Sequence, residues 1–291
     1  MTTRMLEAGL QQVLAPNPSP MTLHGTNTYL IGQSEIAVID PGPAIPAHLE
    51  AIMAAIPAGG RITHILVTHS HLDHSPLAAL LSQRTGAPVL AAGPSDWGRS
   101  PLMQALADEG QLGGGEGVDL EFAPDTQIGE GSRIESSEWQ IETRATPGHM
   151  ANHLSFIWEG AVFSGDLVMD WSTSLVSPPD GDMTAFMASV AALQEMDPRI
   201  FYAGHGNPVN APAARCAELL THRRGREAQI LQALTKGPAD AQGLAKEIYT
   251  DLNPALLPAA ERNTLAHLID LVEKNIAKPD GPLTASAKFS I

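Results

Sequence analysis

Short apolar stretches separated by polar turns recur along the first two thirds of the chain. Residues 62–67 are apolar and partly β-branched, which predicts a buried strand. Residues 139–146 alternate between apolar and polar side chains, and the runs 162–166 and 200–206 are short, apolar and contain glycine. Helices are expected over 44–56, 76–84 and 184–195. Strands alternating with helices predict an α/β fold, in which helices cover two mixed sheets in an αββα sandwich.

The pattern becomes helical after about residue 210. Helices are predicted over 211–235, 241–248 and 259–275. The tail 287–291 is expected to pair as a β-wing. We therefore predict a catalytic domain over 1–210 and a small helical domain over 211–291.

The stretch 93–117 is rich in glycine, most densely at Gly113-Gly114-Gly115-Glu116-Gly117. We interpret this stretch as a mobile surface insertion, either a plain loop or a lid over the functional site. Both alternatives place it outside the predicted strands.

A cluster of metal-binding side chains directly follows the strand at 62–67, in Thr-His-Ser-His-Leu-Asp-His at 68–74. His69 and His71 point the same way in extended chain, where the side-chain period is two. Asp73 and His74 follow as the chain turns into a helix. Packing alone does not explain four such groups, because each costs free energy when buried without a partner. The cluster supplies enough donors for two metal ions.

Three further residues of metal-binding type follow apolar runs, and each stands directly after a glycine. They are His149, Asp166 and His205. Glycine permits unusual backbone angles and close approach of other groups. One such residue alone is as typical of a turn as of a ligand, but the repeated placement at strand ends indicates a single site.

The complete set of motifs resembles the metallo-β-lactamase superfamily, whose signature is HxHxDH followed by a distant His, an Asp and a final His. The resemblance implies two metal sites and a carboxylate that bridges them. The first site would comprise His69, His71 and His149. The second would comprise Asp73, His74 and His205, with Asp166 as the bridge. Imidazole and carboxylate suit two Zn²⁺ ions, although iron and manganese accept similar donors.

Such a site predicts hydrolysis by a metal-bound hydroxide, because two ions lower the pKa of a shared water. Asp73 and Asp166 receive the catalytic assignments, and Asp166 is expected to take a proton during turnover. Asp40 is expected to hold an imidazole in the correct tautomer. The alternative for Asp40 is an ordinary turn-starting residue before Pro41-Gly42.

The branch of the superfamily follows from ligand identity. The chain has Asp166, a bridging residue that true β-lactamases usually lack, and His71 stands where flavodiiron proteins have Glu. Its single cysteine, Cys216, lies well after the last ligand, so the sulfur ligand of another lactamase subclass is missing. The pattern therefore resembles the glyoxalase II and lactonase type of site. Overall the chain resembles the β-lactamase-like protein 2 group, and the supporting segments are 25–30, 171–174, 176–183 and the C-terminal extension. That group implies a winged-helix extension.

Charge bears on the partner of the extension. From residue 213 onward, ten basic and nine acidic residues give a net charge of +1. The whole chain has a net charge of −15, so residues 1–212 carry −16. Such a surface neutralises phosphate poorly. The basic cluster Arg223-Arg224-Gly225-Arg226 is expected to contact phosphate, an acidic substrate tail, or Glu218 and Glu227. We favour a role in the substrate cleft or in a homodimer over RNA binding.

Composition predicts a cytoplasmic enzyme. No apolar run approaches a membrane span, the N-terminus lacks a signal core, and one cysteine cannot form an internal disulfide. The first hypothesis is a hydrolase of a small thioester, ester or lactone, with Thr173 and Ser174 as hydrogen-bond donors to an anionic substrate group. Their alternative is ordinary loop polarity. The second hypothesis is a metal-dependent endoribonuclease on single-stranded RNA, and the third is a non-catalytic binding protein.

Overall fold

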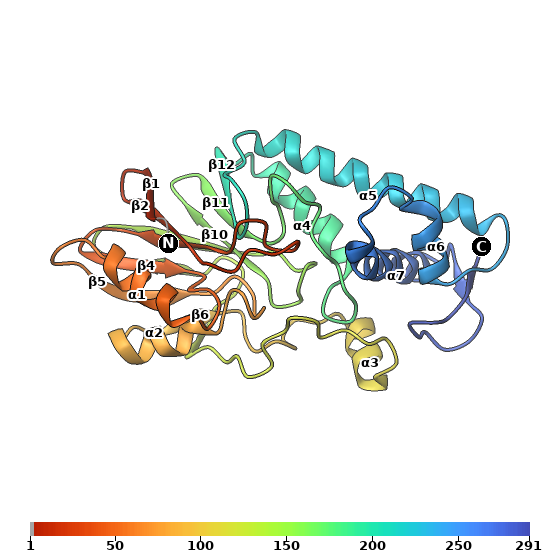
Figure 1. Ribbon diagram of the computed structural model, residues 1–291, viewed down its shortest axis with the longest axis horizontal. Helices are drawn as coiled ribbons and strands as arrows, with labels where there is room; N and C mark the ends of the chain where they lie inside the picture. The colour runs from red at the N-terminus through yellow and green to blue at the C-terminus, as the bar shows by residue number, and fades with distance from the viewer. Residues whose placement is uncertain (1–2) are drawn as a thin grey trace.

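The computed structural model describes residues 3–291, in which two sheets pack face to face (Figure 1). The first sheet has seven strands in chain order, and β4 to β7 run parallel. Its strands are β1 (Thr3–Glu7), β2 (Leu10–Leu14), β3 (Asn27–Ile31), β4 (Glu35–Ile39), β5 (Arg61–Leu66), β6 (Val89–Ala91) and β7 (Thr126–Gln127).

The second sheet has five strands in the order β12-β11-β10-β9-β8. All its pairs are antiparallel except β11 with β12, which is parallel. Its strands are β8 (Arg133–Glu135), β9 (Gln140–Ala145), β10 (Leu154–Trp158), β11 (Ala161–Gly165) and β12 (Ile200–Ala203). The strands predicted at 62–67, 139–146, 162–166 and 200–206 are thus confirmed as β5, β9, β11 and β12.

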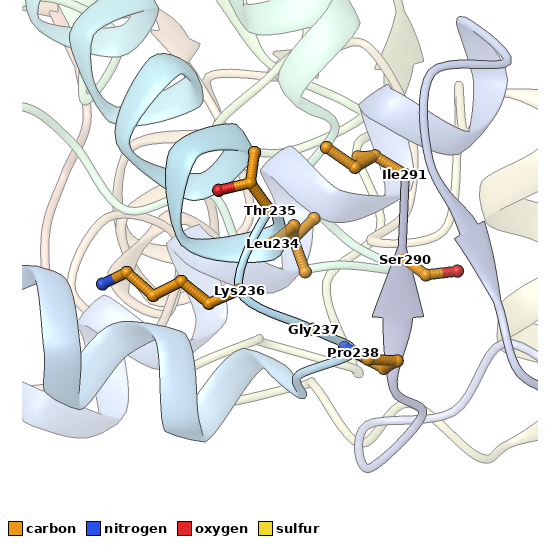
Figure 2. A pocket seen from close by; sticks show the side chains of 7 residues that line it. All are labelled: Leu234, Thr235, Lys236, Gly237, Pro238, Ser290 and Ile291. Carbon is orange, nitrogen blue, oxygen red and sulfur yellow. The ribbon is translucent and has the colours of Figure 1, made fainter.

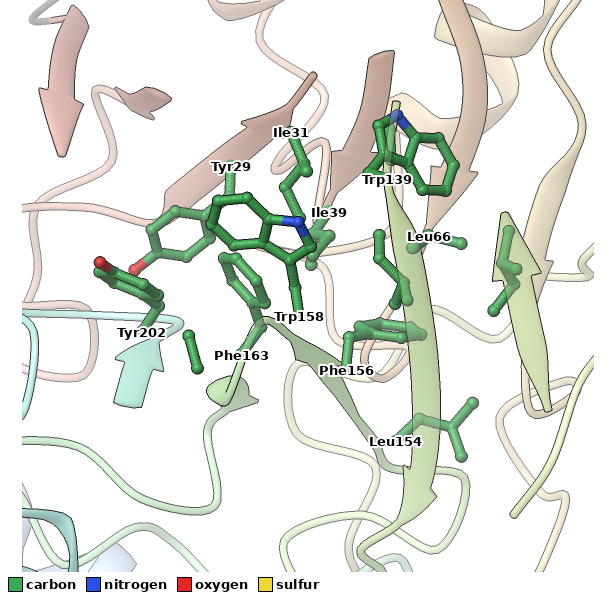
Figure 3. Packing of buried hydrophobic residues seen from close by; sticks show 14 of the residues in the cluster. Tyr29, Ile31, Ile39, Leu66, Trp139, Leu154, Phe156, Trp158, Phe163 and Tyr202 are labelled. Carbon is green, nitrogen blue, oxygen red and sulfur yellow. The ribbon is translucent and has the colours of Figure 1, made fainter. Parts of the chain in front are cut away.

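The core between the sheets follows from side-chain alternation along the strands. On β3, Tyr29 and Ile31 face the second sheet, whereas Leu30 faces the outer helices. Tyr29 meets Phe163 of β11 edge to face, with ring centroids 5.0 Å apart. Figure 3 shows how these rings pack with Phe156 between the two sheets. This packing holds the strand ends that carry the site in fixed positions.

Helices cover both outer faces and complete the predicted αββα sandwich. On the first sheet lie α1 (Pro46–Ala55) and α2 (Leu77–Thr85), and on the second lies α4 (Met183–Glu195). Pro46 stands at the first position of α1, where its missing N–H costs nothing. Gly86 ends α2 in the left-handed conformation that suits glycine.

The C-terminal part forms the predicted helical domain with a wing. Its elements are α5 (Pro212–Leu234), α6 (Ala241–Ile248), the short 3-10 helix η1 (Pro254–Leu256), α7 (Leu257–Glu273), β13 (Lys278–Pro279) and β14 (Phe289–Ser290). β13 pairs antiparallel with β14, so the expected pairing of the tail is confirmed. A pocket of about 430 Å³ lies where the end of α5 meets β14, and its only ionisable side chain is Lys236 (Figure 2).

The first half of α5 belongs to the core of the second sheet. Cys216 and Leu219 are fully buried against Phe186 of α4 and Phe201 of β12. Burial raises the pKa of the Cys216 thiol to about 11. The long helix therefore joins the sandwich to the C-terminal domain.

The interpretation of 93–117 as a mobile insertion is wrong in its middle part. Residues Pro101–Glu109 form helix α3, which Ser100 caps by accepting a hydrogen bond from Met103 N. Met103 and Leu106 are buried in the cluster that also contains Leu268 of α7. This helix is therefore packed onto the C-terminal domain, and its apolar contacts hold it in place.

Among residues 3–291, no helix is both long and apolar enough to cross a bilayer.

Candidate metal centre

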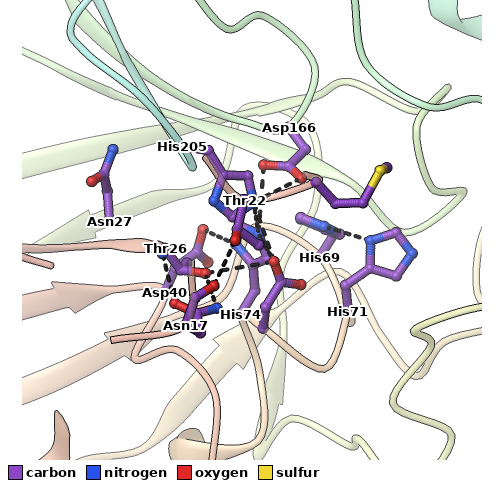
Figure 4. Close-up of polar contacts among 12 residues, drawn as sticks. Asn17, Thr22, Thr26, Asn27, Asp40, His69, His71, His74, Asp166 and His205 are labelled. Carbon is purple, nitrogen blue, oxygen red and sulfur yellow. Dashed lines mark hydrogen bonds and ion pairs between the residues drawn. The ribbon is translucent and has the colours of Figure 1, made fainter. Parts of the chain in front are cut away.

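The seven candidate ligands converge because each follows the C-terminal end of a strand. The stretch 69–74 follows β5, His149 follows β9, Asp166 follows β11 and His205 follows β12. Figure 4 shows five of these side chains drawn close together: His69, His71, His74, Asp166 and His205. His69, His74 and His205 are at most 1% exposed, so their ring nitrogens face each other and not solvent.

The first group of donors consists of His69, His71 and His149, as the sequence predicts. His71 Nδ1 lies 3.0 Å from His69 Nε2 and 2.9 Å from His149 Nε2. One donor atom from each residue lies within 4.8 Å of the other two. This spacing suits three donors around one ion.

The second group consists of Asp73, His74 and His205. His205 Nε2 lies 3.2 Å from Asp73 Oδ2 and 3.4 Å from His74 Nε2. Asp166 lies between the two groups, with oxygens 3.3 Å from His205 Nε2, 3.5 Å from His74 Nε2 and 3.8 Å from His149 Nε2. The carboxylate of Asp166 therefore occupies the position of a bridge.

The outer nitrogens of three imidazoles have hydrogen-bond acceptors that fix the tautomer. His149 Nδ1 donates to Leu175 O (2.6 Å), His205 Nδ1 to Gly25 O (3.1 Å) and His74 Nδ1 to Asp40 Oδ2 (2.9 Å). A neutral imidazole that donates from one nitrogen has a lone pair on the other. The inward Nε2 atoms of His149, His205 and His74 therefore carry a lone pair when these rings are neutral.

The same argument applies to His69 through a relay. Thr68 Oγ1 donates its single proton to the Asp40 carboxylate (2.7 Å), so it accepts from His69 Nδ1 (3.0 Å). His69 Nε2 is then also an inward lone pair. A metal ion bound at these nitrogens would accept such lone pairs.

Asp40 holds two of these imidazoles in place. The side chain is 2% exposed and accepts from Thr68 N (2.7 Å), Thr68 Oγ1 (2.7 Å) and His74 Nδ1 (2.9 Å). Its backbone adopts φ 50°, which is uncommon for a residue other than glycine. The side chain of Asp40 is thus fully used by the strand end and the histidines.

The two donor groups differ in the pKa values of their histidines. Burial, together with the neighbouring His149, lowers the pKa of His71 to about 3, so His71 is neutral. Burial also opposes charge on His205, but the carboxylates of Asp166 and Asp73 raise its pKa to about 9. The side of the centre with the carboxylates therefore attracts positive charge.

The donor set fits two metal ions. It contains imidazoles, whose neutral form offers an inward lone pair, and two carboxylates, which are ligands that zinc accepts. Asp166 Oδ1 is buried and has no hydrogen-bond partner among the described residues. A buried carboxylate oxygen without a partner is costly, and a bound cation would satisfy it.

The expected substrate contacts differ from each other. Ser174 is 5% exposed and its hydroxyl already donates to Leu167 O (3.0 Å), so it presents no free donor. Thr173 is half-buried in the same loop. A role in binding substrate stays a prediction for Thr173 alone.

Sequence reasoning identified Asp40 but not the other groups that support the ligands. The carbonyls of Leu175 and Gly25 carry no side-chain signal, so a sequence cannot single them out. Asn17 Nδ2 donates to Thr26 Oγ1 (2.9 Å), which lies 3.5 Å from Asp73 Oδ2 (Figure 4). The one signal for this second contact was the motif at 25–30, which contains Thr26.

Comparison with known proteins identifies both parts of the chain. Residues 21–205 match the family described as the Metallo-beta-lactamase superfamily. Residues 241–282 match the Beta-lactamase associated winged helix domain. The expectation of a winged-helix extension is therefore confirmed.

Individual relatives agree with this result. A Beta-lactamase-like protein 2 homolog of Drosophila melanogaster is 30% identical, over 91% of this chain and 88% of the relative. An Atrochrysone carboxyl ACP thioesterase of Aspergillus fumigatus is 30% identical, over 79% of this chain and 66% of the relative. The solved structure of a metallo-beta-lactamase family protein from Thermus thermophilus shares the fold, with TM-score 0.77, 24% identity and coverage of 98% and 99% of the two chains.

Proposed function

Because the chain belongs to the metallo-β-lactamase superfamily, whose members are generally hydrolases, we propose that it is a two-metal hydrolase of small thioesters, esters or lactones. The observation that carries the proposal is the convergence of two three-residue donor groups around the Asp166 carboxylate. A relative of 30% identity is named a thioesterase, which supports an acyl bond as the target.

The chain's own residues have separable roles in this reaction. When bound, two divalent ions make a shared hydroxide available near neutral pH and polarise the carbonyl that it attacks. Asp166 would take the proton released in turnover through Oδ1, which is buried and makes no hydrogen bond among the described residues. Asp73 is 27% exposed, so its carboxylate contacts the donor group and is also accessible to solvent. The Asp40 and Thr68 hydrogen bonds keep His69 and His74 oriented.

Two exposed apolar side chains on segments near the candidate ligands favour an apolar substrate group. Leu72, between two ligands in sequence, is 52% exposed. Its N–H donates to Gly117 O (2.7 Å), which brings in the segment that carries Leu120, 74% exposed. Exposed apolar side chains at a site are typical of a binding surface. We call Leu72 and Leu120 the apolar rim and assign to it the acyl part of the substrate.

Single-stranded RNA is the second candidate, and one observation favours it: residues 241–282 match a winged-helix domain. Charge opposes it. In the basic cluster at 223–226, Arg223 is 1% exposed and Arg226 lies over the Tyr249 ring at 4.1 Å. In the pocket beside the wing, Lys236 pairs with Glu247 (2.6 Å). These cations are poorly placed to track a phosphate backbone.

A substrate panel tests the proposal. Metal-loaded protein is assayed against S-lactoylglutathione, a series of acyl-CoA thioesters, a lactone and single-stranded RNA. We expect turnover of at least one acyl compound and loss of that turnover in Asp166→Ala. The matched control is Asp96→Asn, an exposed carboxylate that should leave turnover unchanged. RNA cleavage with steep salt dependence and no acyl turnover would overturn the proposal.

Metal content is tested separately. We propose two zinc ions per chain, and elemental analysis of protein made in metal-replete medium should find about two equivalents. Iron or manganese in place of zinc would revise the identity but not the mechanism. Less than one equivalent of any metal would contradict the two-metal assignment.

A further inference from the structure

A buried arginine of the C-terminal domain holds the loop beside the metal centre. Arg223 of α5 is 1% exposed, and its Nη2 donates to the carbonyls of Thr173 and Ser174, the latter at 2.7 Å. Its Nη1 donates to Asn263 Oδ1 of α7 at 3.0 Å. The guanidinium also lies over the Phe186 ring at 4.9 Å. A planar group with several donors is suited to hold two carbonyls and an amide together.

Asn263 completes the attachment on the other side. Its Oδ1 also accepts from Val176 N at 3.0 Å. The residue between the two attachment points is Leu175, whose carbonyl accepts the 2.6 Å hydrogen bond from His149 Nδ1. Ser174 and Val176 are therefore both fixed by the C-terminal domain, and the carbonyl between them orients a candidate metal ligand.

The backbone at this point needs such support. Ser174 adopts φ 58°, a left-handed conformation that costs free energy for a residue with a Cβ. Its hydroxyl donates to Leu167 O (3.0 Å), which ties the same residue to the end of β11. A strained conformation persists only where its surroundings over-determine it, and here Arg223 supplies two of the hydrogen bonds.

We propose that Arg223 and Asn263 are positioning residues of the metal centre, which fix the Leu175 carbonyl and through it the ring of His149. The proposal rests on the two-metal site proposed above. The winged-helix domain is then a structural part of the centre. Arg223 thus binds the carbonyls of Thr173 and Ser174 and the side chain of Asn263. It contacts neither Glu218 nor Glu227, and its donors are not directed to phosphate or an acidic substrate tail. Glu218 pairs with Arg215 and Glu227 with Lys274.

Zinc affinity tests the proposal without any substrate. We compare wild type, Asn263→Ala, Asn263→Asp and Arg223→Lys by competition with a chromophoric chelator. Asn263→Ala removes the shared acceptor, and support groups of this kind typically change metal affinity about 10–100-fold. Asn263→Asp keeps an oxygen acceptor and should retain affinity within about threefold. Arg223→Lys keeps the charge but loses the planar fork, so its affinity should fall between the two.

Two controls separate positioning from simple loss of stability. Arg224→Met changes the adjacent, exposed arginine and should leave zinc affinity unchanged. Long-range ¹H–¹⁵N spectra of the metal-free proteins report the His149 tautomer, which should become mixed in Asn263→Ala and stay as in wild type in Arg224→Met.

The possible results are distinguishable. If Asn263→Ala and Arg223→Lys lower the unfolding temperature but bind zinc as wild type does, the two residues are merely structural and this proposal is overturned while the proposed function stands. If wild type itself binds no metal, both proposals are overturned.

Discussion

Gly204 shows how closely the site constrains a single residue. It lies between β12 and His205, and an added Cβ would sit 2.7 Å from His74 Cε1 and closer still to Asp166 Oδ1. Neither neighbour can move away freely, because His74 is held by Asp40 and Asp166 is buried. The glycine before His205 is thus required by space, and the sequence motif already marked its position.

Gly204→Ala is expected to weaken metal binding. Overpacking of this kind typically costs about 1–3 kcal/mol, or roughly 5- to 150-fold in affinity if it falls on the bound state. The measurement is zinc affinity by chelator competition.

Gly225→Ala is the control for this substitution. An added Cβ on Gly225 meets nothing within 4 Å in the described part of the chain, and Gly225 lies inside α5. Alanine there should stabilise the fold by about 0.5–1 kcal/mol and leave zinc affinity unchanged. Equal affinities for the Gly204→Ala variant and wild type would contradict the assigned geometry.

His267 is buried on α7 at 2% exposure, and neither ring nitrogen has a partner among residues 3–291. Burial lowers its pKa to about 3, and the charges of Arg223 and Lys274 act in the same direction. In the unfolded chain it titrates near 6.5. Between these pH values the unfolded state binds the extra proton, so His267 lowers stability as the pH falls below 6.5.

His267→Leu should remove this pH dependence. Urea unfolding at about pH 7 and about pH 5.5 is expected to show that wild type loses about 1 kcal/mol more than the variant over this interval. Parallel pH profiles for the two proteins would mean that His267 does not carry the effect.

At the scale of elements, the proposed apolar rim consists of Leu72 and Leu120, which are 52% and 74% exposed. Full burial of one methylene contributes about 0.8 kcal/mol, which sets an upper limit of about fourfold in kcat/KM for each added carbon. A substrate series of increasing acyl length therefore reads out how much of the acyl group contacts protein.

Leu72→Ser is expected to flatten the dependence of kcat/KM on acyl length. Wild type should prefer hexanoyl over acetyl thioesters, and the variant should show a ratio several-fold closer to one. Leu80→Ser is the matched control, since Leu80 on α2 is 47% exposed but stands outside the rim. If all three proteins share one ratio, the rim does not bind the acyl group.

Sequence patterns predicted the elements whose signals are local. Strands β5, β9, β11 and β12 were visible as short apolar or alternating runs, and the ligands lie directly after them. Helix α3 was missed because glycines at 110–117 dominated the interpretation, although Ser100-Pro101 is a typical helix start. The attachment of Arg223 to the 173–174 carbonyls was not predictable, because it joins segments about fifty residues apart through backbone groups.

At the scale of the whole molecule, the metal centre joins β5, β9, β11 and β12 from both sheets. Because a metal ion would bind the donor set only where the fold brings it together, bound metal should stabilise the fold as a whole. A ligand present at about 1,000 times its Kd contributes about 4 kcal/mol.

Removal of metal with a chelator is therefore expected to lower the unfolding temperature by several degrees, and zinc should restore it. Differential scanning calorimetry measures the change. His24→Ala, an exposed histidine outside both donor groups, should respond as wild type does. An unfolding temperature that does not depend on metal would contradict the coupling.

The single thiol of the chain can report the separation of helix α5 from the second sheet. Cys216 of α5 is fully buried against the second sheet and α4, so a thiol reagent reaches it only when α5 separates from them. Its labelling rate in native buffer therefore measures how often α5 separates from the second sheet, and no engineered cysteine is required. If metal binding stabilises the packing of α5 on the second sheet, loading the site with metal will lower the labelling rate of Cys216.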